Sequence, residues 1–153
     1  HYPLRRQRQM CIRDSLCNAP DDRHIDHPKG AKLVVDACFL SGLEKIESTL
    51  EGNKQEPWRP NNIYHYIQWK SLKPDFIVDI SNHFKTKIKS VKAFKSQFYD
   101  GNVTVHNTPI STKNFLDSIE YRARDLGRLT NVDYGEGFIA ARIPLVENIS
   151  ELK

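Results

Sequence analysis

Two histidines and one aspartate, His24, Asp26 and His27, fall within four residues of one another, directly before a predicted helix. A neutral imidazole is a good zinc ligand, and a carboxylate beside it can orient the ring or hold its proton. In a hydrolase, one imidazole can bind the metal while another transfers protons or stabilises an oxyanion. A catalytic zinc normally has three protein ligands, more than one H-x-D-H string supplies. These residues alone therefore leave two interpretations open, surface histidines or a metal or catalytic site.

Helices and extended segments alternate along the chain that must position this cluster. Pro28 suits the first turn of a helix, where its missing N–H is not needed. Ser81 is a suitable N-cap for a second helix, and Gly127 is a suitable stop for a third. The predicted helices cover residues 28–46, 83–98 and 112–127; the extended segments cover 62–69 and 76–80, with a last one entered through 134–138.

The alternation of these elements predicts an α/β layered domain. The apolar run 76–80 suits a strand that is buried on both faces, as in a parallel sheet. A chain of 153 residues is long enough for one domain with a core.

The first fifteen residues match neither helix nor strand periodicity, and they resemble translated sequencing-adapter DNA. Our hypothesis is that residues 1–15 are a non-native or disordered leader and that the natural sequence begins near Leu16. A basic disordered arm is the alternative. This stretch contains four arginines and one aspartate, a net charge of +3. The formal charge of the whole chain is +4, so the remaining residues carry only +1. A nearly neutral body without a basic stripe argues against nucleic acid as a partner.

The composition also predicts the compartment. No apolar run approaches the ~20 residues that cross a bilayer, and the start has no apolar signal region. The three cysteines are odd in number and lack C-x-x-C spacing, which favours a reducing environment. We therefore expect a cytoplasmic protein with no membrane partner.

Several segments beyond the His24–His27 cluster share the order and spacing of a known family. They are residues 23–28, 30–31, 37–43, 58–60, 64–68, 73–81, 95–98, 108–110, 122–124, 127 and 135–138. Together they resemble the LmbE-like (PIG-L) zinc-dependent N-deacetylases from about residue 16 to residue 145. The resemblance is strongest to the subgroup that removes acetyl from N-acetylglucosaminyl-malate in bacillithiol biosynthesis.

This resemblance implies roles for individual residues. His27 matches the third ligand of a catalytic Zn²⁺, His24 matches the histidine that stabilises or protonates the tetrahedral intermediate, and Asp26 matches the carboxylate that supports His24. Arg23 and Arg59 are assigned to substrate binding, with a surface or structural arginine as the alternative for Arg59. The other two zinc ligands and the general base belong to an amino-terminal H-P-D-D motif of the family. Residues 19–22 read A-P-D-D, with alanine in place of the ligating histidine, and we interpret them as a loop.

The resemblance also implies the fold and the activity. We expect a Rossmann-like layered sheet with flanking helices that lacks its amino-terminal strands, so that residues 16–153 are the carboxyl-terminal part of one deacetylase domain. The full-length protein is expected to be a homo-oligomer that hydrolyses the acetamide of a small sugar conjugate. This fragment alone is expected to be inactive. The alternative is a metal-free binding or assembly domain on the same scaffold.

Overall fold

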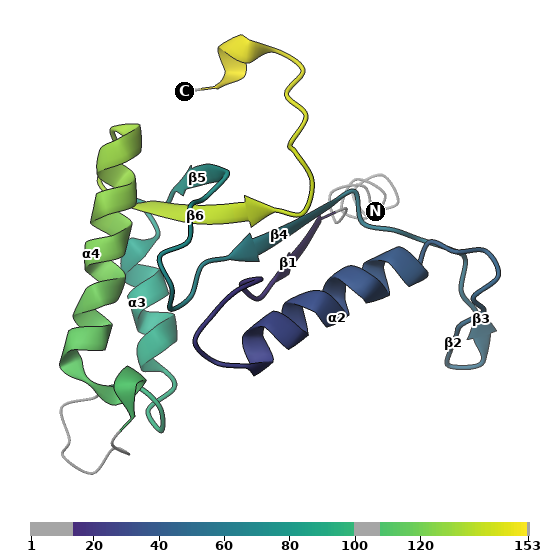
Figure 1. Ribbon diagram of the computed structural model, residues 1–153, viewed down its shortest axis with the longest axis horizontal. Coiled ribbons are helices and arrows are strands. Elements are labelled where there is room, and N and C mark those ends of the chain that lie inside the picture. The colour runs from purple at the N-terminus through teal and green to yellow at the C-terminus, as the bar shows by residue number, and fades with distance from the viewer. Residues whose placement is uncertain (1–13, 100–107, 153) are drawn as a thin grey trace, which may run out of the picture. The chain divides into compact units, whose positions relative to one another are not determined.

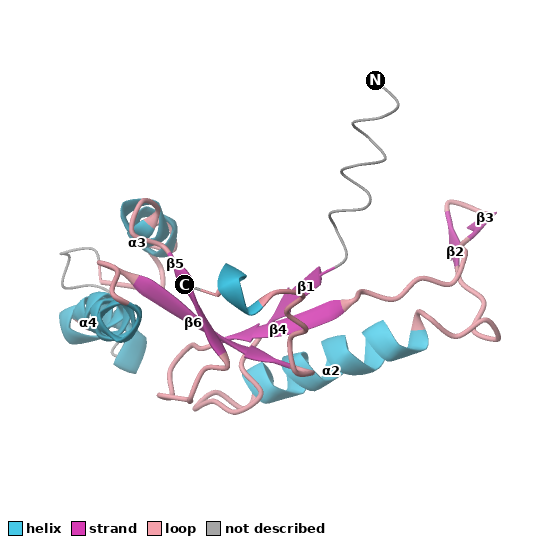
Figure 2. Cartoon of the chain, turned by 90° about the horizontal axis from the view of Figure 1, so that it is seen from above, coloured by secondary structure: helices cyan, strands magenta, loops and turns pink. Residues whose placement is uncertain are grey.

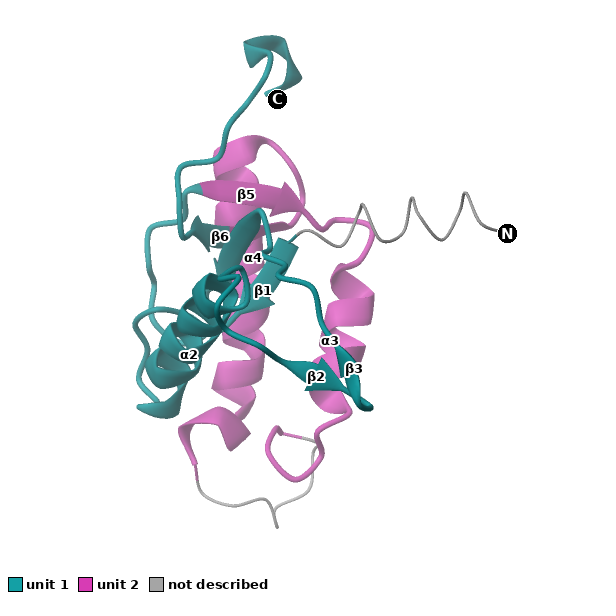
Figure 3. Ribbon diagram, turned by 90° about the vertical axis from the view of Figure 1, so that its right-hand side faces the viewer, with its two compact units in different colours: residues 1–75, 138–152 teal, residues 76–137, 153 magenta. Residues whose placement is uncertain are grey.

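The computed structural model describes residues 14–99 and 108–152. The chain forms two compact units, residues 1–75 with 138–152 and residues 76–137 with 153, coloured separately in Figure 3. Helices and strands alternate along it, so the predicted α/β class is confirmed. No helix in the described ranges is long and apolar enough to span a bilayer.

Unit 1 is built on a mixed sheet with one long helix beside it (Figures 1 and 2). Strand β1 (Asp14–Cys17) runs parallel to β4 (Asn62–Tyr66), and β4 pairs antiparallel with the last residues of β6 (Gly135–Ala140). Helix α2 (Asp26–Leu40) buries Ala31 and contacts β1. Among the described residues β1 pairs only with β4, so its other edge carries no strand.

The rest of unit 1 consists of short elements. A two-stranded hairpin, β2 (Thr49–Leu50) and β3 (Asn53–Lys54), follows α2 and turns through Glu51 and Gly52, whose φ angles are 51° and 80°. The short helix η2 (Ile149–Glu151) lies near the carboxyl terminus.

Unit 2 packs two helices around a small apolar core. It contains β5 (Phe76–Asp79), α3 (Phe84–Lys92), η1 (Pro109–Ser111), α4 (Lys113–Thr130) and the first residues of β6. Ile80, Phe84 and Ala123 are buried together. The Phe84 ring stacks on that of Tyr134 with centroids 4.0 Å apart.

The helices end at different residues from those predicted. Helix α2 stops at Leu40 rather than near position 46, because the carbonyl of Ser41 accepts from the backbone N–H of Trp58 at 2.9 Å. Helix α3 stops at Lys92 rather than at 98, and turns follow it. Helix α4 continues past Gly127 to Thr130, where Asn131 adopts the left-handed conformation (φ 62°) and caps the helix.

Gly127 has another role than the predicted stop. A Cβ at this position would lie 2.6 Å from the carbonyl oxygen of Val132, so the chain can fold back against the helix only if this residue is glycine. The predicted N-cap was also wrong, since α3 begins at Phe84 and its N-cap residue is His83, whose side chain makes no capping hydrogen bond. The Ser81 hydroxyl instead donates to Asp79 Oδ1 and accepts from the Tyr134 N–H.

One further prediction needs correction. Strand β5 is not buried on both faces, because Val78 is 42% exposed. Asp14 and Ser15, at the end of the predicted leader, form the first half of β1 and pair with β4. Residues 1–13 of that leader lie outside the described residues.

Cys17 and Cys38 are free thiols. Cys17 is buried in β1, with its sulfur 3.2 Å from Nδ1 of His65. Burial, together with the neighbouring Cys38, raises the pKa of the Cys17 thiol. Cys38 is half-buried.

Candidate active site

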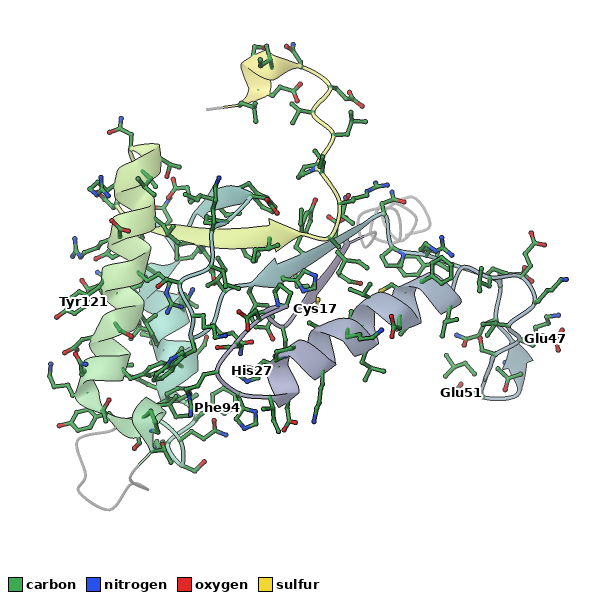
Figure 4. The ribbon with its side chains drawn as sticks, in the orientation of Figure 1. Cys17, His27, Glu47, Glu51, Phe94 and Tyr121 are labelled. Atoms are coloured by element: carbon green, nitrogen blue, oxygen red, sulfur yellow. The ribbon has the colours of Figure 1, made fainter. Side chains whose placement is uncertain are left out.

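The His24–His27 cluster lies where strand β1 leads into helix α2. The strand ends at Cys17, a loop of residues 18–25 follows, and α2 begins at Asp26. Figure 4 shows His27 at the beginning of that helix. The carboxyl ends of parallel strands are where α/β folds usually bind ligands. β1 is parallel to β4, so the cluster lies at such an end.

The loop that carries the cluster is held by the end of β4 and the segment after it. Nδ1 of the buried His65 lies 2.7 Å from the carbonyl oxygen of Asn18, so it donates to that oxygen. The side-chain amide of Asn18 donates to Gln68 at 3.2 Å, and the backbone N–H of Ala19 donates to the same oxygen at 3.4 Å. These bonds join residues almost fifty positions apart, so the tertiary fold determines the path of the loop.

Two charged contacts extend this attachment toward the cluster. Lys70 donates to Asp21 at 2.6 Å, and the Arg23 guanidinium lies 4.8 Å from the centre of the Trp69 ring. A cation over an indole face gains roughly 0.5–2 kcal/mol, depending on its exposure. Loop 18–25 therefore meets residues 65–70 along most of its length.

Asp22 makes the shortest contact to the predicted metal ligand. Its side chain is fully buried, and Oδ2 lies 2.6 Å from Nδ1 of His27. Oδ1 accepts from the backbone N–H of Arg23 at 2.6 Å, and the backbone of Trp69 also hydrogen-bonds to the carboxylate. Burial by itself would raise the pKa of Asp22, but the His27 and backbone hydrogen bonds and the attraction of His27 outweigh it and lower this pKa.

His24 and Asp26 form a second, more open pair. The Asp26 N–H donates to Nδ1 of His24 at 3.3 Å, so neutral His24 carries its proton on Nε2. Asp26 Oδ2 lies 3.7 Å from the same nitrogen, close enough to stabilise a charged ring. The rings of His24 and His27 are 5.2 Å apart between centroids. The structure thus brings together His24, Asp26 and His27, while the guanidinium of Arg23 lies over the Trp69 ring.

Arg59 lies elsewhere. It donates to the backbone carbonyl of Phe39 at 2.7 Å, and its guanidinium lies 4.6 Å from the centre of that ring. Phe39 is twelve residues beyond His27 on α2, about 18 Å at 1.5 Å per residue. Arg59 lines a cavity of about 360 Å³ with Cys38, Ile63 and Arg142 among its walls. The structure therefore does not bring Arg59 together with the histidine cluster.

Among the described residues, His27 is the candidate metal ligand of this site. Within 14–99 and 108–152, no three His, Cys, Asp or Glu side chains gather in a way that could hold a metal ion. His27 has the donor chemistry of a single ligand, because a carboxylate at Nδ1 leaves Nε2 free, as in the carboxylate–histidine–metal arrangement.

Asp22 was not among the predicted site residues. Residues 19–22 were interpreted as a connecting loop, yet Asp22 is the partner of His27. Its separation of five residues from His27 is not a helical spacing, so no periodic pattern marks it. A signal of its role is the burial of a carboxylate, which only the folded chain shows.

Comparisons with known proteins agree on the fold. A conserved protein from Thermus thermophilus is similar with 26% identity and a TM-score of 0.71 over 92% of this chain and 57% of its own. The 4-carboxy-2-hydroxymuconate hydratase of Pseudomonas putida has 16% identity and a TM-score of 0.61, over 95% and 58%. The N,N'-diacetylchitobiose deacetylase of Pyrococcus horikoshii has 23% identity and a TM-score of 0.59, over 92% and 51%.

No protein-family profile matches the chain. The chain spans little more than half the length of the solved proteins that it resembles. It therefore shares an α/β layered fold with proteins that include a sugar deacetylase and a hydratase.

Proposed function

We propose that the whole protein is a zinc-dependent N-deacetylase of the LmbE-like (PIG-L) family, with N-acetylglucosaminyl-malate of bacillithiol biosynthesis as its substrate. The observation that carries this proposal is the placement of His24, Asp26 and His27 on one helix start, with Nδ1 of His27 held by a buried carboxylate. A shared fold with a solved N,N'-diacetylchitobiose deacetylase supports it.

Each residue of the cluster has a task in this proposal. His27 holds the metal through Nε2, because Nδ1 is occupied by Asp22. Zinc, when bound, lowers the pKa of water and polarises a carbonyl. Amide hydrolysis forms a bond between the acetyl carbon and the water oxygen and breaks the bond from that carbon to nitrogen. His24 gives the proton that the departing amine needs, and Asp26 stabilises the charged form of His24.

The remaining ligands are proposed to precede this chain. The open edge of β1 can accept a further parallel strand. The carboxyl end of such a strand would lie beside loop 18–25, because parallel strands end at the same side of a sheet. A ligand pair at that end would complete the shell around His27, and the 153-residue chain without it should bind zinc weakly.

The experiment is to recover the upstream coding sequence and assay the whole protein. We expect an H-P-D-D segment upstream, one zinc per chain and release of acetate from N-acetylglucosaminyl-malate. His27→Ala should lose bound zinc, and His24→Ala should keep zinc but lose about 10²–10⁴-fold in kcat. His83→Ala is the matched control, because His83 is exposed at the start of α3 in unit 2.

The possible results separate the two interpretations of the scaffold. Full zinc content in His27→Ala would remove the metal role of His27, and full turnover in His24→Ala would remove the proton-transfer role of His24. A metal-free binding or assembly domain is the alternative, and an upstream sequence without further metal ligands would favour it.

A further inference from the structure

The hydrogen bond between Asp22 and His27 determines which ring nitrogen of His27 carries a proton. An ionised carboxylate can only accept hydrogen bonds, so the 2.6 Å contact requires the proton to be on Nδ1. The donors around Asp22 favour its ionised form, because the Arg23 and Trp69 backbones also donate to it. In neutral His27, the free electron pair is therefore on Nε2.

Asp22 cannot easily turn away from this contact. Its side chain is fully buried, and Oδ1 is held by the N–H of Arg23 at 2.6 Å. The residues on both sides are also attached to the segment after β4, Asp21 through Lys70 and Arg23 through Trp69. The orientation of the carboxylate is therefore set by the fold of loop 18–25, independently of any bound ligand.

The ring of His27 is partly accessible. The imidazole is 32% exposed, and its buried partner lies on the Nδ1 side. The ring of His24, the other titratable ring of the cluster, lies 5.2 Å away. A partly exposed ring with one nitrogen fixed by a carboxylate is suited to bind a borderline-soft divalent cation such as Zn²⁺ through its other nitrogen.

We infer that Asp22 is the positioning residue of this site: it fixes His27 in the tautomer that leaves Nε2 free for a metal. This inference rests on the proposed function only for the identity of the ligand that Nε2 binds. Asp22 thus has a functional role within a segment, residues 19–22, that the sequence pattern predicts only as a loop.

Asp22→Asn is the informative substitution. An amide has the same shape as a carboxylate, but one of its two polar atoms is an NH₂ group, which donates hydrogen bonds. The Arg23 N–H requires an oxygen at the Oδ1 position, so the amide NH₂ must occupy the Oδ2 position. The NH₂ would then donate to Nδ1 of His27, which must lose its proton. The substitution should therefore move the proton to Nε2 and block the metal position. Asp21→Asn is the matched control, with the same charge change at an exposed neighbour that contacts Lys70.

The first test is long-range ¹H–¹⁵N NMR of the histidine rings in the 153-residue chain, at about pH 8, well above the free-histidine pKa of ~6.5. We expect His27 with its proton on Nδ1 in the wild type and in Asp21→Asn, and on Nε2 in Asp22→Asn. A wild-type proton on Nε2 would overturn the inference, even if the Asp22 variant failed to fold. An unchanged tautomer in a folded Asp22→Asn variant would overturn it as well.

The second test measures Zn²⁺ affinity in the whole protein by competition with a chelator. Asp22→Asn should weaken Zn²⁺ binding about 10–100-fold, the usual effect of removing such a partner, and Asp21→Asn should leave it nearly unchanged. Equal affinities in both variants would overturn the inference. If the whole protein releases no acetate while the tautomer and Zn²⁺ results hold, the proposed reaction fails but the role of Asp22 stands.

Discussion

Replacing Asp22 by asparagine should destabilise the folded chain. The Asp22 carboxylate accepts from His27, from the Arg23 N–H and from the Trp69 backbone while fully buried. Hydrogen bonds to a charged group contribute about 1.5–3 kcal/mol each, and neutral ones about 0.5–1.5 kcal/mol. Asp22→Asn keeps the geometry and converts these bonds to neutral ones. The loss is about 1–1.5 kcal/mol for each of the three bonds, and the lower cost of burying a neutral amide offsets part of it. We therefore expect the free energy of unfolding to fall by about 2–3 kcal/mol.

The comparison with Asp21→Asn isolates this effect from a general change of charge. The Asp21–Lys70 pair is exposed, with relative side-chain exposures of 60% and 45%. Exposed ion pairs contribute about 0–1 kcal/mol. Urea unfolding of the three proteins at about pH 7 measures the difference. If the free energies of unfolding of Asp22→Asn and Asp21→Asn agreed within about 0.5 kcal/mol, the Asp22 carboxylate would not be the buried acceptor described above.

The difference in unfolding free energy between the wild type and Asp22→Asn should depend on pH. The pKa of Asp22 is lowered in the folded chain, so its ionised form stabilises the fold above the unfolded pKa of about 3.9. This stabilisation is lost as the pH falls through the lower, folded pKa. The gap between the wild type and Asp22→Asn should therefore be full near neutrality and narrow below about pH 4. A gap of constant size down to about pH 3 would contradict the assignment.

Three further outcomes are expected. Gly127→Ala should destabilise the chain by about 1–3 kcal/mol, because the new Cβ would lie 2.6 Å from a backbone oxygen. Gly30→Ala, also in a helix, should change the stability by less than about 1 kcal/mol, because its new Cβ would meet only the side-chain oxygen of Asn18, at 3.3 Å; equal urea midpoints of the two variants would contradict this. Phe84→Ala should cost about 3–5 kcal/mol and Phe94→Ala under about 1 kcal/mol, because the first side chain is 6% and the second 59% exposed; similar thermal midpoints would show that the core is elsewhere. Burial and a raised thiol pKa should protect Cys17 from iodoacetamide in the folded chain, so mass spectrometry should find it alkylated only after denaturation; rapid labelling of the folded chain would contradict its burial.

The order of helices and strands could be predicted because it depends on local periodicity and turn residues. The segments 62–69, 76–80 and 112–127 correspond to β4, β5 and α4. Helix ends were less predictable, because long-range contacts compete for the terminal groups. The Ser41 carbonyl accepts from the Trp58 N–H. The Ser81 hydroxyl donates to Asp79 and accepts from the Tyr134 N–H instead of capping a helix. Trp58 and Tyr134 are distant in the sequence, so no local sequence pattern reveals these two contacts.

His24, Asp26 and His27 lie together in the structure because they are neighbours in the sequence, at the start of one helix. The sequence by itself therefore determined the proximity of these three groups and the chemistry they could share. Only the tertiary structure decided which nitrogen of His27 is free, because that depends on a buried carboxylate held by Arg23 and by the distant Trp69 backbone. It also separated Arg59 from the cluster by the length of α2. Burial and long-range hydrogen bonds exist only in the folded chain, and they turn an ordinary aspartate into the partner of a candidate metal ligand.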